Sequence, residues 1–200
     1  VVAYAGQVGL FPGQLQQAIA RRHQGVIAFT TDYEYFDLDE LIGSKKSAKG
    51  GFIVLCDGIE DVHNLGSILR VAECAGADGV VIPKAGSAAV TESVVRISAG
   101  AAEHIKVAKV PNLNAAVETL KKNNYWVYAL EAGGEDIYAE DFSGNVALVV
   151  GGEDSGVKRL TKEKCDKVIS IPLQGKVNSL NASVALGIAA YEVVRKRLGK

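Results

Sequence analysis

The chain has 200 residues, enough for one domain or for one domain with a small appendage. Apolar residues make up 48% of it and charged residues 22%, which is ordinary for a protein with a hydrophobic core. No apolar run approaches the ~18 residues that cross a bilayer, and no basic leader followed by an apolar block opens the chain. We therefore expect no membrane partner and a cytoplasmic location.

The net charge of −1 is low for a nucleic-acid-binding protein, which takes most of its affinity from phosphate contacts. Basic residues cluster at three places, each of which is either a phosphate-binding patch or a solvated surface: 21–23, 45–49 and 195–197. The three cysteines, Cys56, Cys74 and Cys165, are widely spaced, as are the histidines, so we expect no metal site. We expect the cysteines to be small buried hydrophobic residues in a reducing compartment.

The first 36 residues contain too little apolar sequence to fold alone. Leu15, Ala18 and Ile19 fall on one face of a predicted short helix, and 26–29 is an apolar run typical of a strand. The stretch 37–51 is acidic and then rich in lysine, serine and glycine. We interpret it as a linker.

From residue 52 onward, short apolar runs alternate with helical patterns. Strands are predicted at 52–56, 79–82, 105–110, 125–131, 146–150 and 167–171. Helices are predicted at 64–75, 91–97 with Thr91 as N-cap, from Asn112, at 160–165 and at about 180–198. The last helix carries an apolar stripe at helical spacing, made of Leu180, Val184, Ile188, Tyr191, Val194 and Leu198.

This alternation predicts an α/β fold over 52–200, with a mostly parallel sheet and helices on both faces. Ligands bind such folds outside the carboxyl ends of the strands. The loops to inspect are therefore 57–64, 83–90, 132–136, 151–157 and 172–180. Familiar nucleotide motifs are absent from them: no Gly-x-Gly-x-x-Gly follows a strand, and Val157 stands where a phosphate loop needs lysine.

The first unusual segment begins at Asp57 and ends at Arg70. Helical side chains lean toward the N-terminus, so we expect Arg70 to lie over Gly66, toward Asn64 and the loop where a ligand would bind. Gly66 has no side chain to obstruct this path. The alternative is an ordinary helix with Asn64 as N-cap and a surface arginine. In both cases the helix would bury Leu65, Ile68, Leu69 and Ala72.

The second segment, 149–157, is a buried strand that leads into a glycine-flanked acidic loop. Glycines allow backbone amides to approach a ligand closely. Two carboxylates in the loop argue against a phosphate ligand and favour a cationic or hydroxyl-bearing one. A plain turn is the alternative.

The third segment, 171–188, is a strand end, a loop and a helix that begins with Ser179-Leu180-Asn181-Ala182-Ser183. Polar and small residues occupy positions where apolar ones would strengthen the helix. Capping alone would need only one of Ser179 and Asn181. The segment therefore indicates more than a helix start.

Together, the three segments resemble the signature of the SpoU family of RNA 2′-O-ribose methyltransferases, also called the TrmH family. The matching positions are Asn64, Gly66 and Arg70, then Gly152, Glu153 and Gly156, then Ser179-Leu180-Asn181 with Ser183. The chain is most similar to the RlmB-like branch, which acts on 23S ribosomal RNA, and 98–103 and 165–166 also match it. The resemblance covers roughly residues 50 to 198 and is specific because all the motifs occur in order.

The resemblance implies S-adenosylmethionine as cofactor, RNA as partner, and a homodimer whose active site lies near the subunit interface. It also implies a trefoil knot in the C-terminal part of the sheet. Residues 1–36 would correspond to the end of a small RNA-recognition domain that resembles a ribosomal protein. The implied cofactor-binding residues are Gly151, Gly152, Ile171, Leu173, Ser179 and Leu180.

The implied catalytic residues are Asn64, Arg70, Glu153 and Asn181. Asn64 and Asn181 would orient the ribose hydroxyl. An arginine guanidinium stays protonated and is a poor base, so Arg70 is better suited to stabilise a developing alkoxide. Glu153 would hold Arg70 or take part in proton removal, and the base is left open.

Three other functions are compatible with the sequence. A transfer-RNA substrate within the same family is the mildest. A non-catalytic RNA-binding relative is disfavoured because the polar motif residues are all present. An α/β enzyme that uses another nucleotide would be separated by its failure to bind S-adenosylhomocysteine.

Overall fold

The computed structural model describes residues 2–4, 26–28, 33–153 and 155–200. The chain divides into two compact units, residues 1–34 and 35–200. In the first unit, β1 (Val2–Tyr4) pairs with β2 (Val26–Ala28) in antiparallel orientation, which confirms the strand predicted near 26–29. The helix predicted around Leu15 and the basic cluster at 21–23 lie outside the described residues.

The second unit is built on a six-stranded sheet with the order β5-β4-β3-β7-β6-β8, in which every neighbouring pair is parallel. Its strands are β3 (Phe52–Asp57), β4 (Gly79–Pro83), β5 (Lys106–Val110), β6 (Tyr125–Asp136), β7 (Asn145–Gly151) and β8 (Lys167–Ser170). The helices are α2 (Leu38–Ile42), α3 (Val62–Cys74), α4 (Glu92–Ile97), α5 (Leu113–Lys122), α6 (Arg159–Lys164) and α7 (Ala182–Arg197). Short 3-10 helices cover Ala101–Glu103 and Ile137–Ala139.

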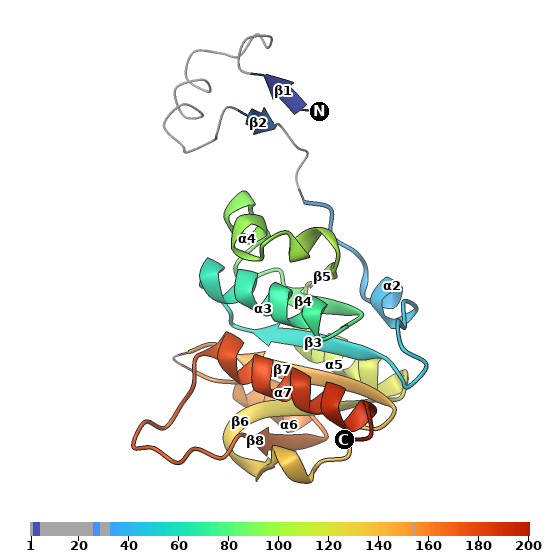
Figure 1. Cartoon of the computed structure of the whole chain (residues 1–200). Coiled ribbons are helices and arrows are strands. Elements are labelled where there is room, and N and C mark those ends of the chain that lie inside the picture. Colours follow the sequence, from blue (N-terminus) through green and yellow to red (C-terminus); the bar gives the residue numbers. More distant parts are fainter. Residues whose placement is uncertain (1, 5–25, 29–32, 154) are drawn as a thin grey trace. The chain divides into compact units, whose positions relative to one another are not determined.

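Figure 1 shows α3 and α7 over one face of the sheet and α5 over the other. Every residue of β3 and β4 is buried, as expected for central parallel strands covered on both sides. The predicted α/β class and mostly parallel sheet are confirmed. The trefoil knot stays a prediction.

Helix starts follow local capping chemistry. Thr91 caps α4 as predicted, and Asn112, where a helix was predicted to start, caps α5; the side-chain oxygens of both accept backbone N–H groups. Helix α3 begins earlier than predicted, because the Asp61 carboxylate accepts the Asn64 N–H at 2.9 Å. Asn64 is therefore not an N-cap, and its side chain is available for other contacts.

The structure corrects the linker prediction for 37–51. A capping box formed by Asp37 and Glu40 starts helix α2, and Leu41 on that helix is fully buried in the core. The Asp78 carboxylate also accepts the backbone N–H of Lys46 at 2.6 Å and that of Phe52 at 2.7 Å. These contacts make the stretch part of the second unit.

Helix α7 packs on the sheet through a different face from the apolar stripe noted in its sequence. Its buried positions are Ala182, Leu186, Ala189, Ala190, Glu192 and Val193. On the stripe, Val184 is 50% exposed, Tyr191 52% and Leu198 61%. A helix that is apolar on both faces leaves one of them without a partner in the monomer.

None of the described helices is both long and apolar enough to cross a membrane. Cys56 is buried as predicted, and burial raises the pKa of its thiol to about 12, so that it stays protonated near neutral pH. Cys74 is exposed, so the expectation of burial was wrong for that residue. It lies on the last turn of α3.

Candidate active site

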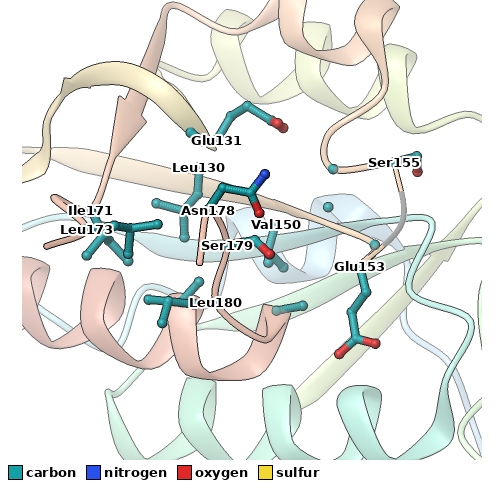
Figure 2. Close-up of a pocket in the computed structure, with 16 residues that line it drawn as sticks. Leu130, Glu131, Val150, Glu153, Ser155, Ile171, Leu173, Asn178, Ser179 and Leu180 are labelled. Atoms are coloured by element: carbon teal, nitrogen blue, oxygen red, sulfur yellow. The ribbon is translucent and has the colours of Figure 1, made fainter. Parts of the chain in front are cut away.

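A cavity of about 480 Å³ opens at the carboxyl ends of the strands (Figure 2). It is lined by the carboxyl-terminal parts of β6 and β7 and by the segments that follow β7 and β8; these three strands are consecutive neighbours in the sheet. All the residues predicted to bind a cofactor lie on its wall: Gly151, Gly152, Ile171, Leu173, Ser179 and Leu180. Residues from around 131, 151 and 180, which are distant in sequence, therefore meet at the edge where parallel sheets bind ligands.

The loop after β7 is tightly closed. Gly156 donates its N–H to the Gly152 carbonyl at 2.9 Å, and a Cβ on Gly151 would lie 2.0 Å from the Gly156 carbonyl carbon. The two amides that follow the loop are held by carboxylates: Val157 N–H by Glu131 at 2.8 Å and Lys158 N–H by Asp57 at 2.9 Å. The loop is thus a preorganised wall of the cavity.

Asn181 connects the three motif segments. Its side-chain N–H₂ group donates to Asn64 Oδ1 at 2.8 Å and to Glu153 Oε1 at 2.6 Å. Its Oδ1 accepts from the Ser183 N–H at 3.0 Å, the Ser183 hydroxyl at 2.7 Å and the Val184 N–H at 3.3 Å. Asn181 is therefore both the N-cap of α7 and the link between the α3 helix and the acidic loop.

This network refines the roles predicted for the polar residues. Both donor hydrogens of Asn181 are used within the protein, so Asn181 positions its neighbours and has no N–H left for a ribose hydroxyl. Asn64 is 8% exposed, and its Oδ1 accepts from Asn181, so its own N–H₂ group is oriented as a donor.

The structure does not support the reason expected for Gly66. A Cβ at this position would lie 2.6 Å from Ile97 Cγ2 and 3.2 Å from the Val94 carbonyl oxygen, so glycine is needed for close packing of α3 on α4. Arg70 is exposed. Among the described residues, the hydrogen bond of Glu153 goes to Asn181, and no ion pair joins Glu153 to Arg70.

Sequence reasoning missed part of the cavity wall. The lining residues that were given no cofactor-binding role are Leu130, Glu131, Ala132, Val150, Ser155, Gly156, Asn178, Ala182 and Ala185, although Gly156 belongs to the second motif and Ala132, Ser155 and Asn178 lie in the predicted ligand-binding loops. The signal for the first three was available in the acidic, glycine-rich stretch that ends β6, which includes the inspected loop 132–136. The cavity is lined by both apolar and polar groups, as is usual for a site that binds a small organic molecule.

The family model described as the SpoU rRNA methylase family matches residues 51–191, which span the sheet and the cavity. The chain belongs to the SpoU rRNA methylase family. A protein of Staphylococcus saprophyticus, named for the TrmH family of tRNA/rRNA methyltransferases, is 49% identical over 177 residues, which cover 88% of this chain and 71% of that protein. The TrmH family protein YacO of Bacillus subtilis is 46% identical over 186 residues, which cover 92% and 75%.

Solved structures of two methyltransferases share the fold. The SpoU methyltransferase AviRb of Streptomyces viridochromogenes, in complex with AdoMet, is 26% identical with a TM-score of 0.74, over 88% of this chain and 68% of that one. An AdoMet-bound rRNA methyltransferase of Sinorhizobium meliloti is 26% identical with a TM-score of 0.76, over 92% and 70%. The fold and the predicted family are therefore confirmed for this chain.

The two functions of Asn181 can be separated by substitution. Asn181→Ala removes the N-cap of α7 and should lower the free energy of unfolding by about 1–2 kcal/mol. Asn181→Ser keeps a capping oxygen and should cost less than about half of that, although it cannot reach both Asn64 and Glu153. Urea denaturation measures both values, with Asn112→Ala at the start of α5 as the control for a plain cap. Equal losses in the serine and alanine variants would show that capping is not what Asn181 contributes.

Proposed function

We propose that the protein transfers a methyl group from S-adenosylmethionine to a ribose 2′-hydroxyl of RNA, with 23S ribosomal RNA as the substrate. The observation that carries this proposal is the convergence of Asn64, Glu153 and Asn181 beside a cavity lined by every predicted cofactor residue. Relatives that share the fold were solved with the same cofactor. Such a substrate places the protein in the cytoplasm.

The cavity fits this cofactor. Its volume of about 480 Å³ is within the usual range for sites that take molecules of this size. Apolar side chains of Leu130, Val150, Ile171 and Leu180 offer surfaces for an adenine ring. Gly151 and Gly152 leave backbone groups open to close approach.

The cofactor supplies a methyl group on a sulfonium, which is electrophilic without further activation. The residues of the chain must then hold the ribose oxygen in line with that methyl and accept the hydroxyl proton. Asn64 donates an N–H to the ribose oxygen, because Asn181 fixes its amide in the donor orientation. Glu153 accepts the proton through Oε2, since Oε1 already accepts from Asn181. Arg70 stabilises the developing alkoxide and remains protonated throughout.

The proposal is tested by incubating the protein with labelled S-adenosylmethionine and unmodified ribosomal or transfer RNA. We expect label in 23S ribosomal RNA and one nucleotide that resists alkaline cleavage, because methylation removes the 2′-hydroxyl nucleophile. Label confined to transfer RNA would move the substrate to the other branch of the family. Binding of RNA without transfer would identify a non-catalytic relative, and failure to bind S-adenosylhomocysteine would contradict the cofactor.

Substitution of Arg70 tests its assigned role. Arg70→Ala should lower kcat by about a hundredfold or more, while calorimetric affinity for S-adenosylmethionine changes little, because Arg70 acts on the ribose oxygen. Arg70→Lys keeps the charge and should retain part of the activity. Arg96→Ala, a matched change on the exposed side of α4, should leave kcat unchanged. Full activity of Arg70→Ala would refute the assignment.

We also propose that the protein is a homodimer whose interface includes the exposed apolar stripe of α7. Val184, Tyr191 and Leu198 lie at helical spacing on the face of α7 that does not contact the sheet. Large exposed apolar side chains in a contiguous stripe commonly mark a protein interface. Ala185, next to Val184, lines the cavity, so an interface here would lie beside the cofactor site.

Charge placed on the stripe should disrupt the dimer. The double variant Val184→Glu with Tyr191→Glu should sediment as a monomer at concentrations where the unaltered protein is a dimer, because each copy would bury two unpaired carboxylates. Leu160→Glu is the control, since Leu160 on α6 is 55% exposed and lies outside the stripe. A dimer that survives the double substitution would exclude the α7 stripe as the interface.

A further inference from the structure

Glu131 reaches the cavity through an irregularity in the sheet. Leu130 and Glu135 on β6 both pair with Ile169 on β8, so the residues between them bulge out of the strand register. The bulge lies at the carboxyl end of β6, and it turns Glu131 and Ala132 into the cavity wall. Figure 2 shows the Glu131 side chain on the cavity wall, directed toward the loop that carries Ser155.

The Glu131 carboxylate is held in place by the loop after β7. Its Oε2 accepts the Val157 N–H at 2.8 Å. The backbone of Gly156, with φ of +60°, packs against the Glu131 carboxylate, and a Cβ on Gly156 would be 2.5 Å from Oε2 and 2.7 Å from Oε1. The loop sequence thus leaves room for a carboxylate that is half-buried beside the ligand space.

The described lining of the cavity contains two carboxylates, Glu131 and Glu153, and no lysine, arginine or histidine. The Glu153 carboxylate is directed toward α3 and α7, where it accepts from Asn181 (Figure 2). Lys158, which follows the loop, pairs with Asp57 at 3.4 Å. Glu131 is therefore the carboxylate whose charge acts mainly on the cavity.

We infer that Glu131 is a specificity-determining residue that makes the site prefer S-adenosylmethionine to S-adenosylhomocysteine. The inference rests on the proposed function. At neutral pH the methyl donor carries one net positive charge because of its sulfonium, whereas the product has a neutral thioether and no net charge. A fixed carboxylate in a partly desolvated cavity attracts the charged form and gains nothing from the neutral one. The site would thus release product after each transfer, when the attraction is lost.

Isothermal titration calorimetry on the intact protein tests this inference without measuring activity. Glu131→Gln removes the charge but keeps an amide oxygen that can accept from Val157, so the loop should stay closed. We expect this variant to bind S-adenosylmethionine about tenfold more weakly and S-adenosylhomocysteine within about twofold of the unaltered protein. An analogue with an amine in place of the sulfonium should follow the methyl donor. Glu135→Gln is the control, because Glu135 lies on the same strand but outside the cavity and pairs with Lys167.

The outcomes separate this inference from the proposed function. Equal weakening of both ligands in Glu131→Gln would mean that Glu131 only supports the loop, and unchanged affinity for both would also overturn the inference; in each case the proposed function stands. If the unaltered protein binds neither ligand, the proposed function fails and the inference falls with it. Should the variant not fold, the relative affinity of the unaltered protein for the two ligands decides. It should bind S-adenosylmethionine more tightly than S-adenosylhomocysteine, and equal or weaker binding of the methyl donor would contradict the inference.

Discussion

The side chain of Asn181 is the contact on which the rest of the site depends. Its carbonyl oxygen accepts backbone N–H groups at the start of α7, and its N–H₂ group donates to Asn64 and Glu153. Because the helix N-terminus needs an acceptor, the amide has one favourable orientation, and its donors must face the other two residues. One cap therefore sets the geometry of two side chains that come from distant parts of the sequence.

The dipole of helix α7 favours the position of Glu153 next to Asn181. No acidic residue lies in the first turn of this helix, although a helix N-terminus favours a nearby negative charge. Glu153 supplies that charge through space, from the loop after β7. The loop can do so because carboxylates of Glu131 and Asp57 hold the amides at its end. The position of the proposed proton acceptor thus follows from the order β3-β7-β6 in the sheet.

The sequence predicted those features that depend on local pattern. Apolar runs located the strands, and Thr91 and the Pro111-Asn112 pair located the starts of α4 and α5. The rule for parallel sheets pointed to the loops that contain Gly151 and Leu180, and the family resemblance assigned both residues to the cavity that they line. Features that depend on distant neighbours could not be found in this way. Glu131 enters the cavity because of a register shift against β8, and Gly66 is required by a helix that lies about thirty residues further along the chain.

Helix α7 shows why pattern alone is insufficient even for a long helix. Leu186 and Val193 on one side and Val184 and Tyr191 on the other have similar apolar character, so periodicity cannot decide which set faces the sheet. The short helix α2 presents the opposite problem, because a single buried leucine, Leu41, attaches it to the core. In both cases the deciding information is the shape of the surface that receives the helix.

The distribution of charge limits the affinity that one copy of the chain can have for RNA. Many basic side chains of the described residues are used within the chain: Arg197 donates to the carbonyls of Gly50, Gly51 and Gly144, and Lys121 pairs with Asp166 at 2.8 Å. Two of the three residues in the basic cluster at 195–197 thus make contacts within the fold: Arg197 with backbone carbonyls and Arg195 with Glu192. A site of this kind on a chain with a net charge of −1 gains little RNA affinity from one copy alone. A second copy with the same charge distribution adds no net positive charge, so RNA affinity in the proposed dimer would depend on where exposed basic residues such as Arg70 lie and not on total charge.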